Sequence, residues 1–409
     1  MSCSDPCVDL RPATRRANAG ESEEGTGPLR VRVVDRMEEL HEYADAWNAL
    51  SYEVPPRLPT SSYAWVSTCF EHSLKAHEAW CCVLACHGDH LVGVLPLVVS
   101  RMALFGCTRL HTPMGGHIIA VSPLVLPGEE EATVLRALLD AAWARHPDAV
   151  WIELRDVAAN VPFLRHVHEH WHREISRRTG RYLRVDGDPG LYQASLSRNF
   201  RSNQRKAANK LRKLNGVDTA FVLGPEASSA QLPEFLPVEA AGWKGREGTA
   251  IQKSSALVAF YTTLTMRLAD AGWLEWHFLR AEGRAIAANL GVRFNRSIIV
   301  WKLGYDEGYR QCSPGGMLFQ SLLDRAFADP DIEEVNLLTD ASWYDNWRMD
   351  EREYYRIRLY RRGRPVSILL GFVLDGATGV LRRSKTVRFL VRTGWRFMQR
   401  CIRSFAARE

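Results

Sequence analysis

The chain has 409 residues, of which 46% are hydrophobic and 24% charged, values that are typical of globular proteins. A single hydrophobic core rarely grows beyond about 250–300 residues, so this length predicts two domains. The formal net charge of +6 comes from residues 361–409, which carry twelve Arg or Lys and two acidic residues, while the rest of the chain is slightly acidic. This distribution excludes a chain-wide nucleic-acid surface.

Cysteine usage and hydropathy exclude two further classes. The nine cysteines include no Cys-x-x-Cys pair, which favours reduced thiols in a cytosolic protein over a disulfide or zinc framework, so we expect no metal. No run reaches the roughly 20 apolar residues that span a bilayer. Residues 1–28 are rich in Ser, Glu and Gly and lack an apolar segment. We therefore expect them to be disordered rather than a signal peptide.

The first half of the chain reads as alternating strands and helices around one hairpin. Its loop at residues 112–117 contains two glycines and could approach a ligand, and the glycines and proline of residues 187–190 predict a domain boundary. The expected strands are 29–34, 80–85, 91–99 and 149–154, and the expected helices are 37–50, 63–73, 129–145 and 161–171.

A strongly basic helix is predicted near the start of the second half, after a short strand at 191–196. Residues 198–214 hold seven basic residues and no acid, and their apolar residues fall near one helical face. The basic side chains, including Arg201 and Arg205, either form a solvated face or bind an anion such as a phosphate or a carboxylate. A nucleic-acid helix fits less well, because exposed aromatic residues that could stack on bases are missing.

Residues 276–338 are the most informative stretch. They predict three consecutive antiparallel strands, a turn at residues 313–316, an amphipathic helix and a further strand. Ser313 suits an N-cap and Pro314 suits the first helical position. A glycine-bearing turn that opens a helix offers unpaired N–H groups and a positive helix end, which suits a pyrophosphate, although an ordinary capped helix would read the same way.

This stretch resembles the core of the GNAT acyl-CoA N-acyltransferases, in particular the CelD-like branch associated with bacterial polysaccharide loci. The similarity covers roughly residues 30–362 and is most specific in the second half. It also extends to the Fem-type aminoacyltransferases, which have paired lobes. The residues that carry the resemblance are 239–245, 283–287, Tyr305, Asp306, 313–315, Tyr344 and Trp347.

The resemblance implies an α/β fold with two tandem GNAT-like lobes, residues 29–186 and 187–362, followed by a tail at 363–409. It implies acyl-CoA, with an acetyl or longer acyl group, as the co-substrate. Its pyrophosphate would lie at the turn formed by Gln311, Ser313, Gly315 and Gly316. The acceptor would contact Trp243, Arg201 and Arg205.

The candidate acid–base residues lie at two helix and strand ends. Glu239 is four residues before Trp243, so its carboxylate is expected beside the indole on one helix face. Glu239 and Lys244 form either a general base pair or a surface ion pair. Asp306 could be a base or could cap a turn, and Tyr305 precedes it. Tyr344 falls where many GNAT enzymes place the tyrosine that protonates the thiolate, and it could equally be a packed aromatic residue.

The tail combines apolar residues at a spacing of three to four with arginines at positions 388, 392, 396 and 400. This pattern is typical of a basic amphipathic helix, which either packs across the lobes or attaches to an anionic membrane surface. We therefore expect a cytoplasmic protein that is either free or peripheral on the inner face of the membrane.

The predicted reaction is transfer of an acyl group from acyl-CoA to an amine on an amino sugar, an amino acid or a cell-envelope or polysaccharide precursor. Two alternatives remain at this point. One is aminoacyl transfer from a charged tRNA to a peptidoglycan precursor, and the other is a non-catalytic interaction protein of a polysaccharide-export system.

Overall fold

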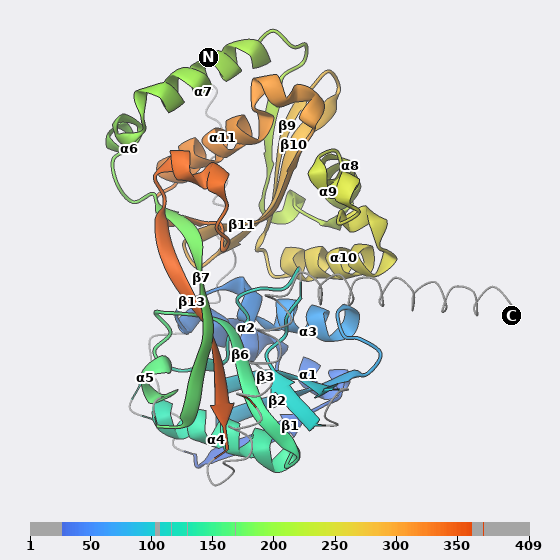
Figure 1. The fold of residues 1–409 in the computed structure, drawn as a ribbon, viewed down its shortest axis with the longest axis vertical. Helices are drawn as coiled ribbons and strands as arrows, with labels where there is room; N and C mark the ends of the chain where they lie inside the picture. The colour runs from blue at the N-terminus through green and yellow to red at the C-terminus, as the bar shows by residue number, and fades with distance from the viewer. Residues whose placement is uncertain are drawn as a thin grey trace, which may run out of the picture.

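One mixed sheet runs through the protein (Figure 1). The computed structural model describes residues 27–361, apart from 103–106, 116, 129 and 168, together with Gly371. The 13-stranded sheet has the order β1-β2-β3-β4-β6-β13-β7-β12-β11-β10-β9-β8, with β5 paired to β3. The strands are β1 (Leu29–Val34), β2 (Glu78–His87), β3 (His90–Met102), β4 (Cys107–His111), β5 (Leu124–Val125), β6 (Ala149–Ala158), β7 (Trp171–Arg184), β8 (Asp218–Val222), β9 (Leu274–Ala281), β10 (Arg284–Phe294), β11 (Ser297–Tyr305), β12 (Glu334–Asn336) and β13 (Asp350–Tyr360).

The helices cover both faces of this sheet, so the fold is of the mixed α/β class that the sequence predicts. They are α1 (Met37–His41), α2 (Ala44–Glu53), α3 (Tyr63–His72), α4 (Glu131–Arg145), α5 (Leu164–Val167), α6 (Pro189–Ser195), α7 (Arg198–Leu211), α8 (Leu232–Ala240), α9 (Trp243–Glu247), α10 (Ser255–Asp270) and α11 (Pro314–Ala328). Among the described residues, no helix has the length and apolar character needed to cross a bilayer.

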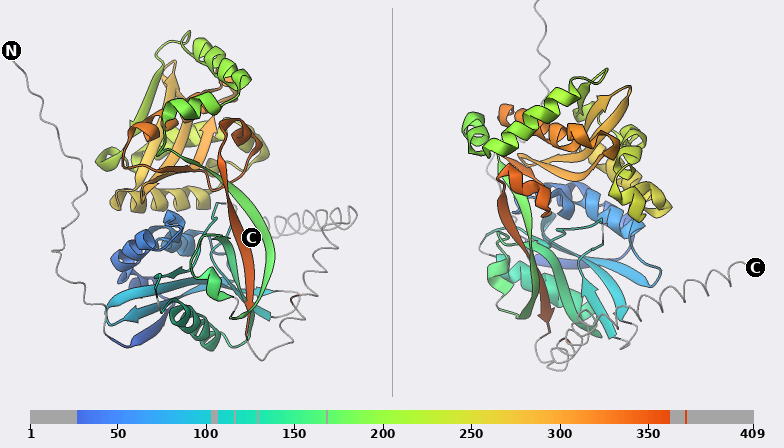
Figure 2. Two further views of the ribbon diagram at one scale, coloured as in Figure 1. Left: turned by 90° about the vertical axis from the view of Figure 1, so that its left-hand side faces the viewer. Right: turned by 45° about the horizontal axis from the view of Figure 1, so that its top comes forward.

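Two long strands join the halves of the molecule, as Figure 1 and the left view of Figure 2 show. β7 pairs with β13 along almost its whole length, and its last residues pair with β12, where Arg184 faces Glu334. β13 in turn pairs with β6 of the first half, where Leu359 faces Ile152. The last described strand of the chain therefore completes the sheet of the first half.

In the second half, alternate residues of β11 belong to two different apolar layers. Ile299 and Trp301 pack into the main core with residues of α8 and α10, whereas Ile298 and Val300 pack into a second core beneath α11. The halves meet where α10 lies on α3 (Figure 1). Trp301 of the second half contacts Trp65 of the first edge-to-face, at 4.4 Å between ring centroids. β11 is thus held between both cores and the neighbouring half.

Two predicted elements were wrong. Residues 191–196 are not a strand but part of α6, because Asp188 caps a helix by accepting hydrogen bonds from the N–H groups of Gly190 and Leu191. The helix expected at 161–171 shrinks to α5, and Trp171 already begins β7. β7 is polar along much of its length and is fixed by backbone pairing with β13, a partner too distant in sequence for local patterns to reveal.

The disordered segment expected at 1–28 and the tail expected at 363–409 lie outside the described residues, except for residues 27, 28 and 371.

Candidate functional site

The open edge of β11 defines the site. β11 runs parallel to β12 only from Ser297 to Ile299, and beyond that point no described strand pairs with this edge. On its other edge the register against β10 shifts so that Trp301 is an extra residue, a β-bulge. Bulges are common next to active sites because they redirect the side chains around them. The last residues of β11 therefore offer backbone groups and side chains to a ligand.

Helix α8 approaches β11 closely enough to require a glycine. A Cβ atom on Gly304 would lie 2.5 Å from the Cα of Glu239, a backbone atom that has no room to move aside. Glu239 is only 2% exposed, and its Oε2 accepts a hydrogen bond of 3.0 Å from the N–H of Ile251. Its Oε1 lies 3.2 Å from the Nζ of Lys244, so both carboxylate oxygens have protein partners.

Lys244 connects this carboxylate to the strand. Its Nζ donates a hydrogen bond of 2.8 Å to the carbonyl oxygen of Leu303 on β11. The predicted pair of Glu239 and Lys244 thus exists, and the structure places it against β11 rather than on an open helix surface.

Lys302 is a candidate that the sequence analysis missed. Burial, helped by the positive charge of Lys244, lowers its pKa from 10.5 to about 8. Among the described residues, no carboxylate lies within ion-pair distance of its Nζ, which lies 5.6 Å from the centroid of the Trp301 ring. A lysine inside a predicted strand carries no motif, so only the three-dimensional surroundings could identify it.

The first half of the chain contributes His117 to the same region. Its Nδ1 lies 2.9 Å from the hydroxyl of Tyr261 on α10. Burial lowers the pKa of His117 to about 4, and the charges of Lys302 and Lys244 act in the same direction. The imidazole is therefore neutral near pH 7.

Tyr305 and Asp306 end β11 and have different surroundings. Tyr305 is 36% exposed, and its ring borders the first turn of α11, where a Cβ on Gly315 would lie 3.4 Å from its Cδ1. Asp306 accepts a hydrogen bond of 2.8 Å from the N–H of Gly308 and forms an ion pair of 3.0 Å with Arg284. Its carboxylate therefore caps the turn, one of the two roles the sequence allowed.

The predicted pyrophosphate turn leads from β11 into α11 through a 3₁₀ helix, Glu307–Cys312, in which Gln311 is exposed. Ser313 is the N-cap residue of α11 as predicted, but it has a φ of 47° and its side chain makes no capping hydrogen bond. Pro314 occupies the first turn as expected. Gly316 lies close to the side chain of Ser313, because a Cβ there would be 2.8 Å from the Oγ of Ser313.

Helix α7 lies over this turn (Figure 1). The Nε2 of Gln204 is buried without a hydrogen-bond partner and would lie 3.9 Å from a Cβ on Gly316. Arg201 and Arg205 are exposed on the same helix. An unsatisfied donor, a helix N-terminus and exposed cations therefore gather at one place, which suits a phosphate.

Two predicted residues remain. Tyr344 lies apart from the open edge of β11, and Trp243 is only partly described. Tyr344 is buried in the apolar core beneath α11 with Phe319 and Trp347, and burial raises its pKa to about 12. Trp243 begins α9, and the structure describes its backbone only. Within the described part of the chain, no group of three or more His, Cys, Asp or Glu side chains is placed to hold a metal ion.

The helix that occupies the corresponding place in the first half has the opposite electrostatic character. α4 begins with Glu131, which is buried and forms ion pairs with Arg165 and His166. A carboxylate at a helix N-terminus repels phosphate, whereas α11 has no acidic residue in its first turn. Of these two helix ends, only that of α11 suits a pyrophosphate.

The sequence comparisons agree with this geometry. Residues 198–354 match the model of the family described as "Acetyltransferase (GNAT) domain". This range includes α7, β11, α11 and β12. A search of curated proteins found no match.

Among solved structures, the crystal structure of FemX matches with 12% identity and a TM-score of 0.58, covering 83% of this chain and 99% of FemX. At this identity the match shows a shared fold. A tandem GNAT protein from the clavulanic acid biosynthesis pathway is similar with 14% identity, a TM-score of 0.44 and coverage of 81% of this chain and 98% of that one. L-PGS from Bacillus licheniformis is similar with 14% identity and a TM-score of 0.45, and the match covers 84% of this chain and 98% of that one.

Proposed function

We propose that the chain, whose residues 198–354 match a GNAT acetyltransferase domain, is a GNAT-type N-acyltransferase that moves an acyl group from acyl-CoA to an amine. The acceptor is an amino sugar, an amino acid or a cell-envelope or polysaccharide precursor. The observation that carries the proposal is the open edge of β11, a strand that is bulged against β10 on its other edge and leads through a short 3₁₀ helix into a helix opened by Gly315 and Gly316.

The donor would lie along this edge. The N–H groups of Gly315 and Gly316 and the unsatisfied Nε2 of Gln204 would bind the pyrophosphate, since all three are donors at the positive end of α11. Gln311 borders this turn, and Arg201 and Arg205 are close enough in sequence to Gln204 to face a further phosphate from α7. The thioester would then reach the residues around the bulge.

Lys302 is the residue we assign to proton transfer. With a pKa of about 8, it is partly neutral near physiological pH and can accept the proton of an ammonium acceptor. The amine nitrogen attacks the thioester carbon, the C–N bond forms and the C–S bond breaks. The proton held by Lys302 then passes to the leaving thiolate, whose conjugate thiol has a similar pKa of about 8.5.

Glu239 and Lys244 would support this group. Because both oxygens of Glu239 are engaged, we assign the pair to holding the end of β11 and to setting the charge beside Lys302. Tyr305 is 36% exposed, its ring borders the first turn of α11, and it would contact the donor. Tyr344 and Asp306 would act through packing and turn geometry, and Trp243 would border the acceptor.

An assay of thiol release tests the proposal. Purified protein is mixed with acetyl-CoA or longer acyl-CoAs and a panel of amines, and free thiol is measured. We expect amine-dependent release, and a loss of at least 100-fold in Lys302→Met because a general base contributes on the order of 10²–10⁴-fold. Turnover with a charged tRNA and none with any acyl-CoA would instead support aminoacyl transfer, the alternative that the shared fold with FemX keeps open.

Attachment to a membrane is a separate proposal that rests on the tail sequence alone. The arginines at positions 388, 392, 396 and 400 and the interleaved apolar residues fit an anionic leaflet at the inner face of the membrane. The intact chain should float with anionic liposomes, and a chain of residues 1–362 should not. Equal flotation of both would contradict the proposal.

A further inference from the structure

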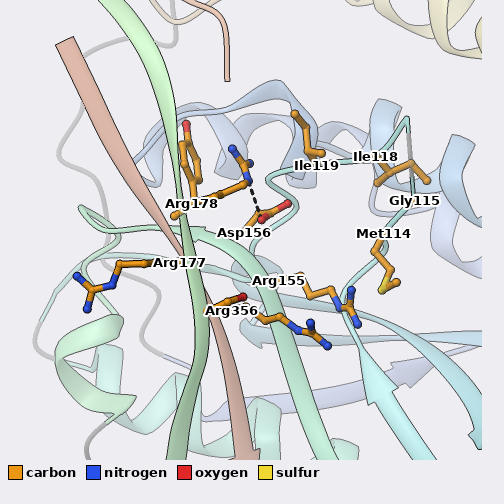
Figure 3. A pocket seen from close by; sticks show the side chains of 11 residues that line it. Met114, Gly115, Ile118, Ile119, Arg155, Asp156, Arg177, Arg178 and Arg356 are labelled. Atoms are coloured by element: carbon orange, nitrogen blue, oxygen red, sulfur yellow. Dashed lines mark hydrogen bonds and ion pairs between the residues drawn. The ribbon is translucent and has the colours of Figure 1, made fainter. Parts of the chain in front are cut away.

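A second concave site lies outside the acyl-transfer machinery, in the first half of the chain. It has a volume of about 470 Å³ and lies between the loop around Ile118 and strands β6, β7 and β13 (Figure 3). Ligand pockets typically measure about 300–1,000 Å³. A cavity of this size holds a ligand larger than a single phosphate.

Arginine side chains dominate this pocket. Arg155, Arg178 and Arg356 line it from three different strands, and Figure 3 shows Arg155 beside Arg356 and Arg178 bonded to Asp156. A bulge brings consecutive residues of β6 into the wall, because Asp156 has a φ of 53° and the register against β13 shifts beside it. The bulge thus brings together guanidinium groups that the usual alternation of side chains between the two faces of a strand would separate.

The positive charges of the pocket exceed the available negative charge. Glu153 is 1% exposed and lies 2.5 Å from Arg155, 2.9 Å from Arg356 and 2.7 Å from Arg358. Burial raises the pKa of Glu153, but the charges of Arg155, then Arg356 and Arg358, outweigh it and hold the pKa at about 2. One carboxylate therefore faces three guanidinium groups. Arg178 is matched by Asp156 at 2.8 Å, which leaves an excess positive charge around Glu153.

Several donors in the pocket are also unsatisfied. The Nε of Arg155, the Nε of Arg356 and the Nη2 of Arg178 are buried without hydrogen-bond partners, as is the hydroxyl of Tyr354. A buried donor without a partner is unfavourable, so a site that collects four such groups favours an acceptor-rich ligand. Planar guanidinium groups match the oxygens of a phosphate.

We propose that this arginine pocket, defined by Arg155, Arg178, Tyr354 and Arg356, binds the phosphate or pyrophosphate group of the acceptor substrate. The apolar side chains of Met114, Ile118 and Ile119 on the opposite wall would contact the organic part of that ligand. The loop that carries Ile118 also carries His117, which contacts Tyr261 near Lys302. The pocket and the acyl-transfer site therefore share one loop, and an acceptor anchored in the first presents its amine toward the second. The assignment to the acceptor rests on the proposed function, whereas anion binding does not.

Calorimetric titration with inorganic pyrophosphate tests anion binding, and it is made in excess CoA so that the proposed donor turn of α11 is occupied. We expect the wild type to bind, and Arg356→Lys, which keeps the charge beside Glu153 but loses the planar fork, to bind at least tenfold more weakly. Ser176→Asp adds a carboxylate at an exposed position of the lining without removing an arginine, and it should weaken binding to a similar degree. Arg184→Gln is the matched control, because Arg184 lies on β7 with Ser176 but outside the lining of the pocket. This variant should bind pyrophosphate within twofold of wild type.

Absence of pyrophosphate binding by the wild type, or unchanged binding in a folded Ser176→Asp variant, would overturn the site. The acceptor assignment is tested by turnover of glucosamine 6-phosphate and glucosamine, two amines that differ in the phosphate. We expect kcat/KM to be at least tenfold higher for the phosphorylated amine and this preference to disappear in Ser176→Asp. Pyrophosphate binding with equal turnover of the two amines would refute the acceptor role alone, and no turnover of any amine would instead count against the proposed function.

Discussion

The Nζ of Lys244 donates a hydrogen bond of 2.8 Å to the carbonyl oxygen of Leu303, which lies one residue beyond Lys302 on β11. The same ammonium group is 3.2 Å from the buried carboxylate of Glu239. One side chain thus links helix α8, helix α9 and the open end of β11. The electrostatic surroundings of Lys302 depend on this link, because Lys244 lowers its pKa.

Removal of the Glu239 carboxylate should destabilise the protein strongly. Glu239→Ala leaves the mostly buried Lys244 and the N–H of Ile251 without their partner, and breaking a buried ion pair costs about 3–5 kcal/mol. We expect a decrease of about 3 kcal/mol in the free energy of unfolding, measured with urea. Glu247→Ala, an exposed residue of α9, is the control and should change stability by less than about 0.5 kcal/mol. Equal stabilities of the two variants would show that the pair does not hold β11.

The activity should follow the ionisation of Lys302. Below a pH of about 8 its amine is protonated, so kcat/KM should rise about tenfold per pH unit and level off above that value. The acceptor amine ionises too, so the profile is compared with that of Lys302→Arg under the same conditions. A profile that is the same in both proteins would assign the ionisation to the acceptor.

Stability should also change with pH through Lys302. Its pKa is about 8 in the folded protein and near 10.5 in the unfolded chain. Between these values the unfolded state binds more protons, so stability rises with pH from about 8 to 10.5, and the penalty of a buried charge is fully present below 8. The stability difference between Lys302→Met and wild type should therefore favour the variant at pH 7 and shrink as the pH rises to 10.5. A difference that is constant over this range would contradict the depressed pKa.

A carboxylate at position 204 should weaken donor binding. Gln204→Glu replaces the buried, unsatisfied Nε2 by a negatively charged oxygen beside Gly316. We expect the Kd for CoA, measured by calorimetry, to rise at least tenfold. Asn203→Asp makes the same change of charge at the adjacent exposed residue and should alter the Kd less than threefold. If both variants bind equally, α7 contributes only a general electrostatic field.

The contact between α8 and β11 should not tolerate a methyl group. In Gly304→Ala the new Cβ would lie 2.5 Å from the Cα of Glu239, so α8 must shift. Overpacking of this kind costs about 1–3 kcal/mol, visible as a lower urea midpoint. Gly187→Ala is the control, because a Cβ there has nothing within 4 Å. A midpoint unchanged in both would show that α8 is free to move.

Local sequence patterns predicted the elements of the second half well. The meander of β9, β10 and β11, the helix α11 and the basic helix α7 all follow from turn residues and apolar periodicity. The α/β class is confirmed, and residues 198–354 match the GNAT acetyltransferase domain that the resemblance predicts. By contrast, β7 and β13 depend on pairing between residues more than 160 positions apart, from Asp350 with Tyr182 to Tyr360 with Trp171, and no local pattern encodes that pairing.

The site residues divide in the same way. Glu239 and Lys244 could be paired from their spacing, but their burial against Gly304 could not be foreseen, because it depends on where α8 packs. Lys302 and His117 come from different halves of the chain and gain their shifted pKa values from burial, which a sequence does not display. The roles predicted for the site residues stay predictions until variants are measured.

Thermal unfolding in the presence of CoA and a series of acyl-CoAs, on wild type and Gly315→Glu, tests the central claim most directly. A ligand at 100 times its Kd adds about 2.7 kcal/mol to the stability of the folded state, which corresponds to a rise of about 3 °C in Tm. We expect this rise in the wild type and its loss in Gly315→Glu, whose carboxylate would lie at the first turn of α11 beside Tyr305. No rise with any acyl-CoA, or an equal rise in both proteins, would contradict the assignment of the α11 turn as the donor site.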